Sequence, residues 1–172
     1  KGSGEKVPFM DCTIVSGYIP GAIGRVAELH GLYYHDNWDF GVFFEAKMAI
    51  ELSQFLQSYH PDSDGFWLAL CGGRIIGSIA IVGEEPDAGV GRLRWFVLDP
   101  AYQGRGVGGL LMDKAMAFCR KAGFRRVYLT TFAGLDAARH LYERAGFRLA
   151  EEQEGSHWGK TVPEQIFELI LR

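Results

Sequence analysis

The chain has 172 residues, of which 48% are hydrophobic, and this size and composition suit one globular domain with a sizeable core. Charged residues make up 23% of the chain, which excludes wholesale disorder. The formal net charge is −3 and the sequence has no Lys/Arg-rich run, so a strongly basic nucleic-acid binder is excluded. No apolar run reaches the roughly 18 residues that a membrane span needs. We therefore expect neither nucleic acid nor a membrane as a partner.

The three cysteines, Cys12, Cys71 and Cys119, lie far apart in the sequence. Their odd number and their spacing match neither a zinc finger nor a disulfide framework. Dispersed thiols suit a reducing compartment. We therefore expect three unpaired, buried cysteines in a cytoplasmic protein, and no metal site.

The N-terminal part of the chain predicts a strand and then a helix. We interpret residues 1–8 as a tag remnant or a disordered tail, and residues 9–172 as one domain. Residues 12–16 predict a short strand. Apolar residues from Ile23 to Leu32 recur at helical spacing, and the aromatic patch at residues 33–38 is expected to interrupt this helix.

A second helix is predicted from Phe43 to Tyr59, because its apolar residues form one stripe and Pro61 follows. The pattern then changes to short apolar runs between turn residues, which is typical of strands. The predicted strands are residues 66–71, 74–82, 93–98, 127–132, 147–150 and 165–171. Two further helices are predicted, from the glycine-rich turn at 104–109 to Gly123 and from Asp136 to Ala145. This order predicts a single α/β domain in which helices flank a mixed central β-sheet.

Residues 103–109 read Gln-Gly-Arg-Gly-Val-Gly-Gly, and a helix is predicted to begin within them. Unpaired N–H groups and the positive end of the helix dipole make such a turn a site for phosphate. Gly104, Gly106 and Gly109 also match the dinucleotide fingerprint G-x-G-x-x-G. However, residues 99–103 separate the glycines from the preceding strand, and the next strand ends without a ribose-binding acid, which argues against that fingerprint. A Walker P-loop is excluded because no Gly-Lys-Ser/Thr lies in this turn.

Gln103, Gly106 and Gly108 form the pattern Gln/Arg-x-x-Gly-x-Gly/Ala, which resembles the acyl-CoA pyrophosphate motif of the GCN5-related N-acetyltransferases, the GNAT family. The resemblance extends to the strand end and turn at residues 98–108. Residues 138–147, Ala-Arg-His-Leu-Tyr-Glu-Arg-Ala-Gly-Phe, are similar to the later helix and the following strand of that family. The resemblance thus covers most of the chain and implies a GNAT-type domain.

Residues 17–21, 44–45 and 156–159 resemble the acetyltransferase domain that is often fused behind a MarR-type winged-helix regulator. Any such DNA-binding half would precede Lys1. Leu135 stands where many GNAT members have an Asn that contacts the CoA arm, and the fused subgroup resembles this chain in lacking it.

The resemblance implies an N-acetyltransferase that moves an acetyl group from acetyl-CoA to a primary amine of a small molecule or peptide. It implies direct attack through a tetrahedral intermediate, without a metal. The alternatives are an acyl-CoA-sensing regulatory domain without turnover and a Rossmann-type oxidoreductase. The implied cofactor-binding residues are Phe96, Val97, Leu98, Gln103, Gly104, Arg105, Gly106, Val107, Gly108, Gly109 and Leu135. Because dimers are common in the family, the resemblance is also compatible with a homodimer.

Tyr142 is the implied general acid, because it lies where the family's acid Tyr points at the cofactor sulfur. A phenol with a pKa of about 10 stays protonated at neutral pH and can protonate a departing thiolate. The acceptor pocket is expected to contain acids and aromatic residues that suit a small cationic amine or the amine of a peptide. These residues are Tyr33, Asp36, Trp38 and Glu45. The strand at 92–98 contains no acid, so the general base stays open among Glu45, His35, Asp36, Glu84 and His157.

Overall fold

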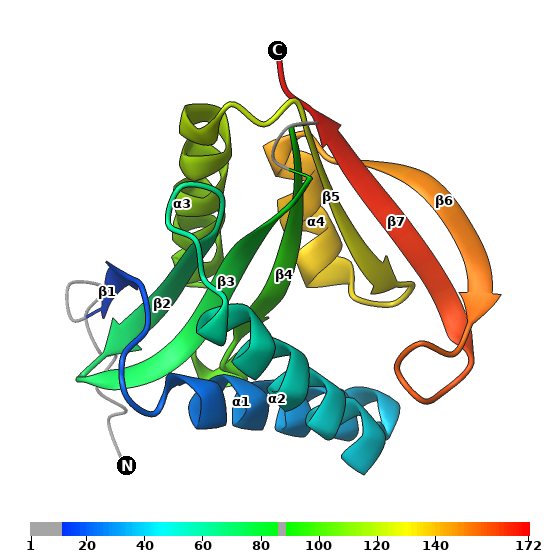
Figure 1. Ribbon diagram of the computed structural model, residues 1–172. Helices are drawn as coiled ribbons and strands as arrows, with labels where there is room; N and C mark the ends of the chain where they lie inside the picture. The colour runs from blue at the N-terminus through cyan, green and yellow to red at the C-terminus, as the bar shows by residue number, and fades with distance from the viewer. Residues whose placement is uncertain (1–11, 86–88) are drawn as a thin grey trace.

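The computed structural model describes residues 12–85 and 89–172, which form a seven-stranded sheet with helices on both faces (Figure 1). The elements are β1 (Cys12–Ser16), α1 (Ala22–Trp38), α2 (Val42–Gln57), β2 (Gly65–Cys71), β3 (Arg74–Glu85), β4 (Val90–Leu98), the 3-10 turn η3 (Pro100–Tyr102), α3 (Val107–Ala122), β5 (Arg126–Phe132), α4 (Asp136–Ala145), β6 (Arg148–Gly155) and β7 (Val162–Ile170). The strand order is β1-β2-β3-β4-β5-β7-β6, and the β4–β5 pair is parallel while the others are antiparallel. The predicted mixed α/β fold is confirmed, whereas residues 1–8 lie outside the described residues.

Two apolar cores cover the two faces of the sheet. Side chains alternate along a strand, so β2 directs Trp67 and Ala69 to one face and Phe66 and Leu68 to the other. Helices α3 and α4 cover the first face, and α1 and α2 cover the second (Figure 1). None of the described helices is long and apolar enough to cross a membrane. The helices of both layers therefore pack their apolar stripes onto the sheet.

Helix α1 continues through the aromatic patch at residues 33–38, which the sequence predicts to interrupt it. The Tyr34 ring packs 4.7 Å from the Phe44 ring and 5.8 Å from the Phe132 ring, measured between centroids. Asp39 ends the helix in the left-handed conformation, and its N–H donates to carbonyls of the last turn. Packing of the aromatic rings thus extends the helix beyond what its local sequence predicts.

Cys12 and Cys71 form a disulfide, so the expectation of three unpaired cysteines is wrong. The two residues are 59 positions apart in sequence, and they become neighbours because β1 pairs antiparallel with β2. Sequence spacing does not reveal such a pair, since the contact depends on strand register. Cys119 is a buried free thiol, as expected.

Strand β4 is irregular at Trp95. Its register with β3 shifts between Ser78 and Ala80, and Trp95 has a φ of 47°, a left-handed conformation that is rare for a bulky residue. The Ser78 hydroxyl donates a 2.7 Å hydrogen bond to the Trp95 carbonyl, so this oxygen has a partner at the bulge. Within the described strands, β4 pairs with β5 at residues 90–92 alone. The two strands then diverge, as Figure 1 shows.

Replacing Ser78 with Ala removes the donor to the Trp95 carbonyl and leaves that oxygen without its partner. We expect Ser78→Ala to lower the free energy of unfolding by about 1–3 kcal/mol, measured by urea denaturation. The matched control is Ser53→Ala, which removes a hydroxyl that donates to the Ala49 carbonyl within α2. Its effect should be near zero, because Ala is the better helix former. An equal loss in both variants would contradict a specific role of Ser78 at the bulge.

Candidate active site

Three cavities adjoin one another where β4 and β5 diverge. The first, of about 580 Å³, is lined by the glycine-rich turn, β4 and α4, and we call it the turn cavity. The second, of about 80 Å³, lies between β4 and β5 and is the central cavity. The third, of about 400 Å³, contains Arg92 and Arg94 and is the arginine cavity. Tyr34 and Phe96 line both the turn and the central cavities, and the two arginines line both the central and the arginine cavities. The three cavities therefore follow one another through the opening.

The turn cavity gathers most of the predicted cofactor-binding residues. Those that line it are Phe96, Val97, Leu98, Gln103, Gly104, Gly106, Gly108, Gly109 and Leu135. Gly106 precedes α3 with a φ of 82°, a conformation that favours glycine. A Cβ added to Gly104, Gly106 or Gly109 would meet no atom within 4 Å. The first N–H groups of α3 have no partner inside the helix, so the open turn and the positive helix end suit a phosphate group.

Two predicted cofactor residues do not line the turn cavity with their side chains. Val107 is 1% exposed and packs in the core under α3, so it retains a backbone role alone. Arg105 is exposed, and its guanidinium lies 5.5 Å from the centre of the Tyr102 ring. Gly108 lines the cavity, but a Cβ on it would lie 3.0 Å from Leu141 of α4. Gly108 is therefore also needed for the close packing of α3 on α4.

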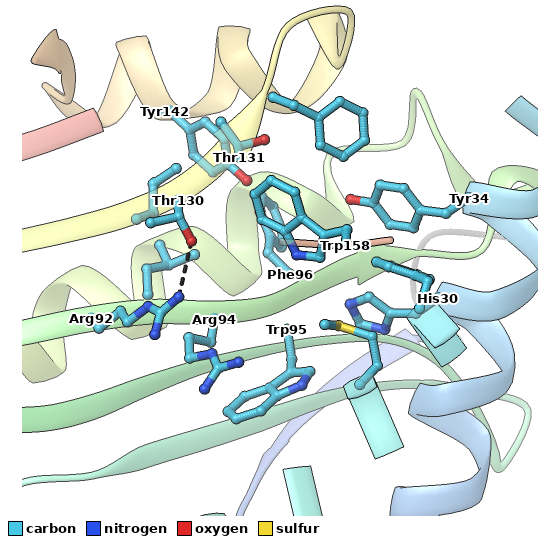
Figure 2. Close-up of a pocket in the computed structure, with 15 residues that line it drawn as sticks. His30, Tyr34, Arg92, Arg94, Trp95, Phe96, Thr130, Thr131, Tyr142 and Trp158 are labelled. Atoms are coloured by element: carbon cyan, nitrogen blue, oxygen red, sulfur yellow. Dashed lines mark hydrogen bonds between the residues drawn. The ribbon is translucent and has the colours of Figure 1, made fainter. Parts of the chain in front are cut away.

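Tyr142 extends from α4 into the central cavity, and Figure 2 shows its hydroxyl pointing into that space. Its ring packs against Phe96 and Phe147 at centroid distances of 6.0 and 6.2 Å. Burial, with a smaller contribution from Tyr33, raises the pKa of Tyr142 well above its ordinary value. The phenol is therefore protonated at neutral pH and can donate a proton into the cavity.

Two residues of α1 also face the central cavity, and neither is among the four acceptor-pocket residues named above. Burial raises the pKa of Tyr34, whose hydroxyl points toward the opening in Figure 2. His30 is buried, and its Nδ1 lies 2.8 Å from the Val26 carbonyl, which requires the proton on Nδ1. Burial lowers the His30 pKa to about 4, so the ring is neutral at pH 7 and its Nε2 is an acceptor. The four-residue spacing of the two residues, which places them on one helix face, could have identified this pair.

The structure brings Tyr33, but not the other predicted acceptor residues, to one of these cavities. Asp36 and Glu45 are exposed, and the Glu45 side chain lies over a glycine of α1. Trp38 packs 5.2 Å from the Phe132 ring. Because α1 stays helical to its end, it turns Tyr33 inward and Asp36 toward solvent. Asp36 and Glu45, the acids from which a cationic acceptor was predicted, therefore lie outside the three cavities.

Of the five candidate bases, His157 alone lines one of the three cavities. Its Nδ1 lies 2.5 Å from the Glu164 carboxylate in the arginine cavity. Glu84 instead accepts a hydrogen bond from the Tyr128 hydroxyl, and the exposed His35 contacts a backbone carbonyl. In the parts of the chain that the structure describes, no group of three or more His, Cys, Asp or Glu residues could hold a metal ion. The imidazoles that line the three cavities are thus neutral His30 in the central cavity, paired His157 in the arginine cavity and His140 in the turn cavity.

Arg92 and Arg94 extend from β4 into the arginine cavity, and neither is among the residues that the sequence predicts for the site. Arg94 Nη2 lies 2.5 Å from Glu51, and its guanidinium lies 4.2 Å from the centre of the Trp95 ring. Arg92 Nη2 donates a 2.9 Å hydrogen bond to the Thr130 hydroxyl. Among the described residues, the buried Arg92 Nε has no hydrogen-bond partner. Because alternate residues of a strand face the same side, their spacing could have placed the arginines together.

Comparison with known proteins gives a family match over most of the chain. Residues 25–147 match the model of the Acetyltransferase (GNAT) family. N-acetylaspartate synthetase of Homo sapiens is 32% identical over 124 residues, which cover 71% of this chain and 41% of that protein. Mycothiol acetyltransferase of Geodermatophilus obscurus is 39% identical over 90 residues, which cover 50% of this chain and 29% of that protein. The match thus spans less than half the length of either relative.

Solved structures share the fold. An acetyltransferase of the GNAT family from Streptococcus pneumoniae has a TM-score of 0.71 and 25% identity, and the match covers 94% of this chain and 99% of that one. An acetyltransferase from Salmonella typhimurium, solved with its cofactor acetyl-CoA, has a TM-score of 0.66 and 17% identity, with coverage of 94% and 95%. At that identity the second likeness shows the fold alone.

The open space at the turn predicts acetyl-CoA binding that a negative side chain would prevent. Acetyl-CoA at about 100 times its dissociation constant should stabilise the protein by about 2.7 kcal/mol, measured as a rise in melting temperature. Gly109→Glu should abolish this rise, because it places a carboxylate beside the expected pyrophosphate. Gly109 has helical geometry and open space, so the variant should fold and its helix should gain stability.

The matched control is Gly24→Glu, which adds the same side chain at an open helical position of α1 outside the three cavities. This variant should keep the full acetyl-CoA shift. A folded Gly109→Glu variant with unchanged affinity would place the cofactor elsewhere. Gly108→Val is a less specific test, because its side chain would also meet Leu141.

Proposed function

Because the chain belongs to the GNAT family of acetyltransferases, we propose that it transfers an acetyl group from acetyl-CoA to a primary amine of a small molecule or peptide. The observation that carries the proposal is the succession of cavities, with the glycine-rich turn at one end, Arg92 and Arg94 at the other, and Tyr142 between them. A transferase with two substrates needs two approaches to one reaction centre. A domain that senses acyl-CoA needs a single approach, so this geometry favours turnover.

The turn cavity offers the donor substrate both charge and backbone contacts. The N-terminus of α3 would hold the pyrophosphate. Among the described residues, the β5-facing edge of β4 has no strand partner beyond residue 92, so the backbone at Phe96–Leu98 is available to an amide-containing arm. When bound there, acetyl-CoA supplies a thioester carbonyl that an amine can attack. A backbone N–H on the same edge would stabilise the developing oxyanion.

Tyr142 is suited to protonate the leaving thiolate. A free thiol has a pKa of about 8.5, so protonation assists its departure at neutral pH. Burial keeps the Tyr142 phenol protonated, and the hydroxyl faces the cavity between the two substrate approaches. The neutral His30 ring, on the opposite wall of the cavity, can accept a hydrogen bond from the incoming amine.

The family relation leaves the acceptor open, since the names of the two relatives refer to N-acetylaspartate and to mycothiol. Likeness to MarR-fused acetyltransferases, homodimer formation and the absence of nucleic-acid or membrane partners remain our predictions. A cytoplasmic location also remains a prediction. The redox state of the Cys12–Cys71 bond in cells tests it, because disulfides persist mainly in oxidising compartments.

A screen that follows thiol release from acetyl-CoA with a panel of amines tests the proposed function. Tyr142→Phe keeps the ring and removes the hydroxyl, so we expect turnover to fall at least roughly tenfold while acetyl-CoA affinity changes little. Because the Tyr142 pKa is raised, loss of its proton should not lower turnover between pH 7 and about 10.

The control is Tyr128→Phe, which removes a β5 hydroxyl that donates to Glu84 outside the three cavities. Its turnover should match that of the unmodified protein. If Tyr142→Phe is equally active when chemistry limits the rate, Tyr142 is not the acid. Acetyl-CoA binding without thiol release for any amine class would favour the sensing alternative.

A further inference from the structure

The arginine cavity combines fixed cations with fixed carboxylates. Lys47 from α2 and Arg92 and Arg94 from β4 contribute three cations. Glu51 pairs with both Lys47 and Arg94, at 2.9 and 2.5 Å, and Glu84 lies 3.8 Å from Arg92. Glu51 is thus shared between two cations, whereas Arg92 has a longer contact to Glu84.

Two further acids of this cavity, Glu151 and Glu164, form no ion pair with Arg92 or Arg94 among the described residues. Glu164 is engaged by His157, through both its ring and its backbone N–H. Glu151 lies at the exposed rim, where solvent and salt screen its charge. Although burial opposes ionisation of Glu51, Lys47 and Arg94 together lower its pKa, so it stays charged and paired. Glu51, the carboxylate that contacts Arg94, is therefore already paired on both sides.

The two arginines retain donors for a further anion. A guanidinium has five N–H groups in a planar fork that matches a carboxylate. Arg94 has one hydrogen-bonded carboxylate partner, Glu51, and lies over the Trp95 ring, which fixes the plane of the fork. Arg92 donates to Thr130 through Nη2, while its buried Nε has no partner among the described residues. The remaining N–H groups of the two guanidiniums are the donors that a bound anion would use.

We propose that the arginine cavity binds a carboxylate of the acceptor, which makes the acceptor an amine of the amino-acid class rather than a polyamine. This proposal rests on the proposed function for its reaction but on Arg92 and Arg94 for its specificity. Both arginines also line the central cavity, so a carboxylate held there directs the attached amine toward Tyr142.

The kinetic test compares three matched acceptor series: free α-amino acids, their carboxamides and the corresponding decarboxylated amines. We expect kcat/KM for the free acids to exceed that for the other two series at least about tenfold. Arg94→Gln should remove this preference mainly by raising KM, and Arg94→Lys, which keeps the charge but loses the planar fork, should keep part of it. Arg126→Gln, which removes an arginine that pairs with Glu168 outside the three cavities, should keep all of it.

A binding test separates this proposal from the proposed function. The protein saturated with CoA is heated with N-acetyl amino acids or with their carboxamides, and the melting temperature is measured. The carboxylate site is supported if the acids alone stabilise the protein, even if no acceptor is turned over. This stabilisation should be lost in Arg94→Gln and in Arg92→Gln and kept in Arg126→Gln. Equal effects of acids and amides, or a preference that survives both arginine variants, overturns it, even if other amines are acetylated.

Discussion

Neighbouring parallel strands normally stay hydrogen-bonded along their length, but β4 leaves β5 after three residue pairs. The departure coincides with the bulge at Trp95, where a bulky residue has a positive φ and the Ser78 hydroxyl holds the displaced carbonyl. The Phe55 ring stacks 5.3 Å from the Trp95 ring and covers the bulge from α2. All three cavities lie along the gap that this divergence opens, so the candidate site depends on one irregular strand.

Helices replace the contacts that the strands lose at the gap. Tyr34 of α1 packs against Phe132 at the end of β5, and Tyr142 of α4 packs against Phe96 of β4. The same rings exclude water, which is why the pKa values of Tyr34 and Tyr142 both rise. The packing that closes the gap therefore also keeps two phenols protonated at its centre. Under the proposed function, the same packing would prepare Tyr142 for acid catalysis.

The sequence predicts those parts of the site that depend on local chain geometry. The glycine-rich residues 104–109 form a turn before a helix. Tyr142 lies in a short helix that begins at Asp136 and is closed by Gly146. The Cys12–Cys71 bond and the extension of α1 depend instead on strand register and ring packing between distant segments. Local propensity contains neither kind of information, so both predictions fail there.

The positions of charged side chains along the helices and strands decide which acceptor groups the three cavities can bind. Acids of α1 and α2 such as Asp36 and Glu45 lie on the solvent side, where water stabilises them, and they leave the inner wall to β4. There Arg94 must be shared between Glu51 and any bound carboxylate. Lys47 makes this sharing possible, because it neutralises Glu51 on the other side and reduces its hold on Arg94. Glu51 then positions the guanidinium without cancelling its charge, as a fixed carboxylate clamp requires.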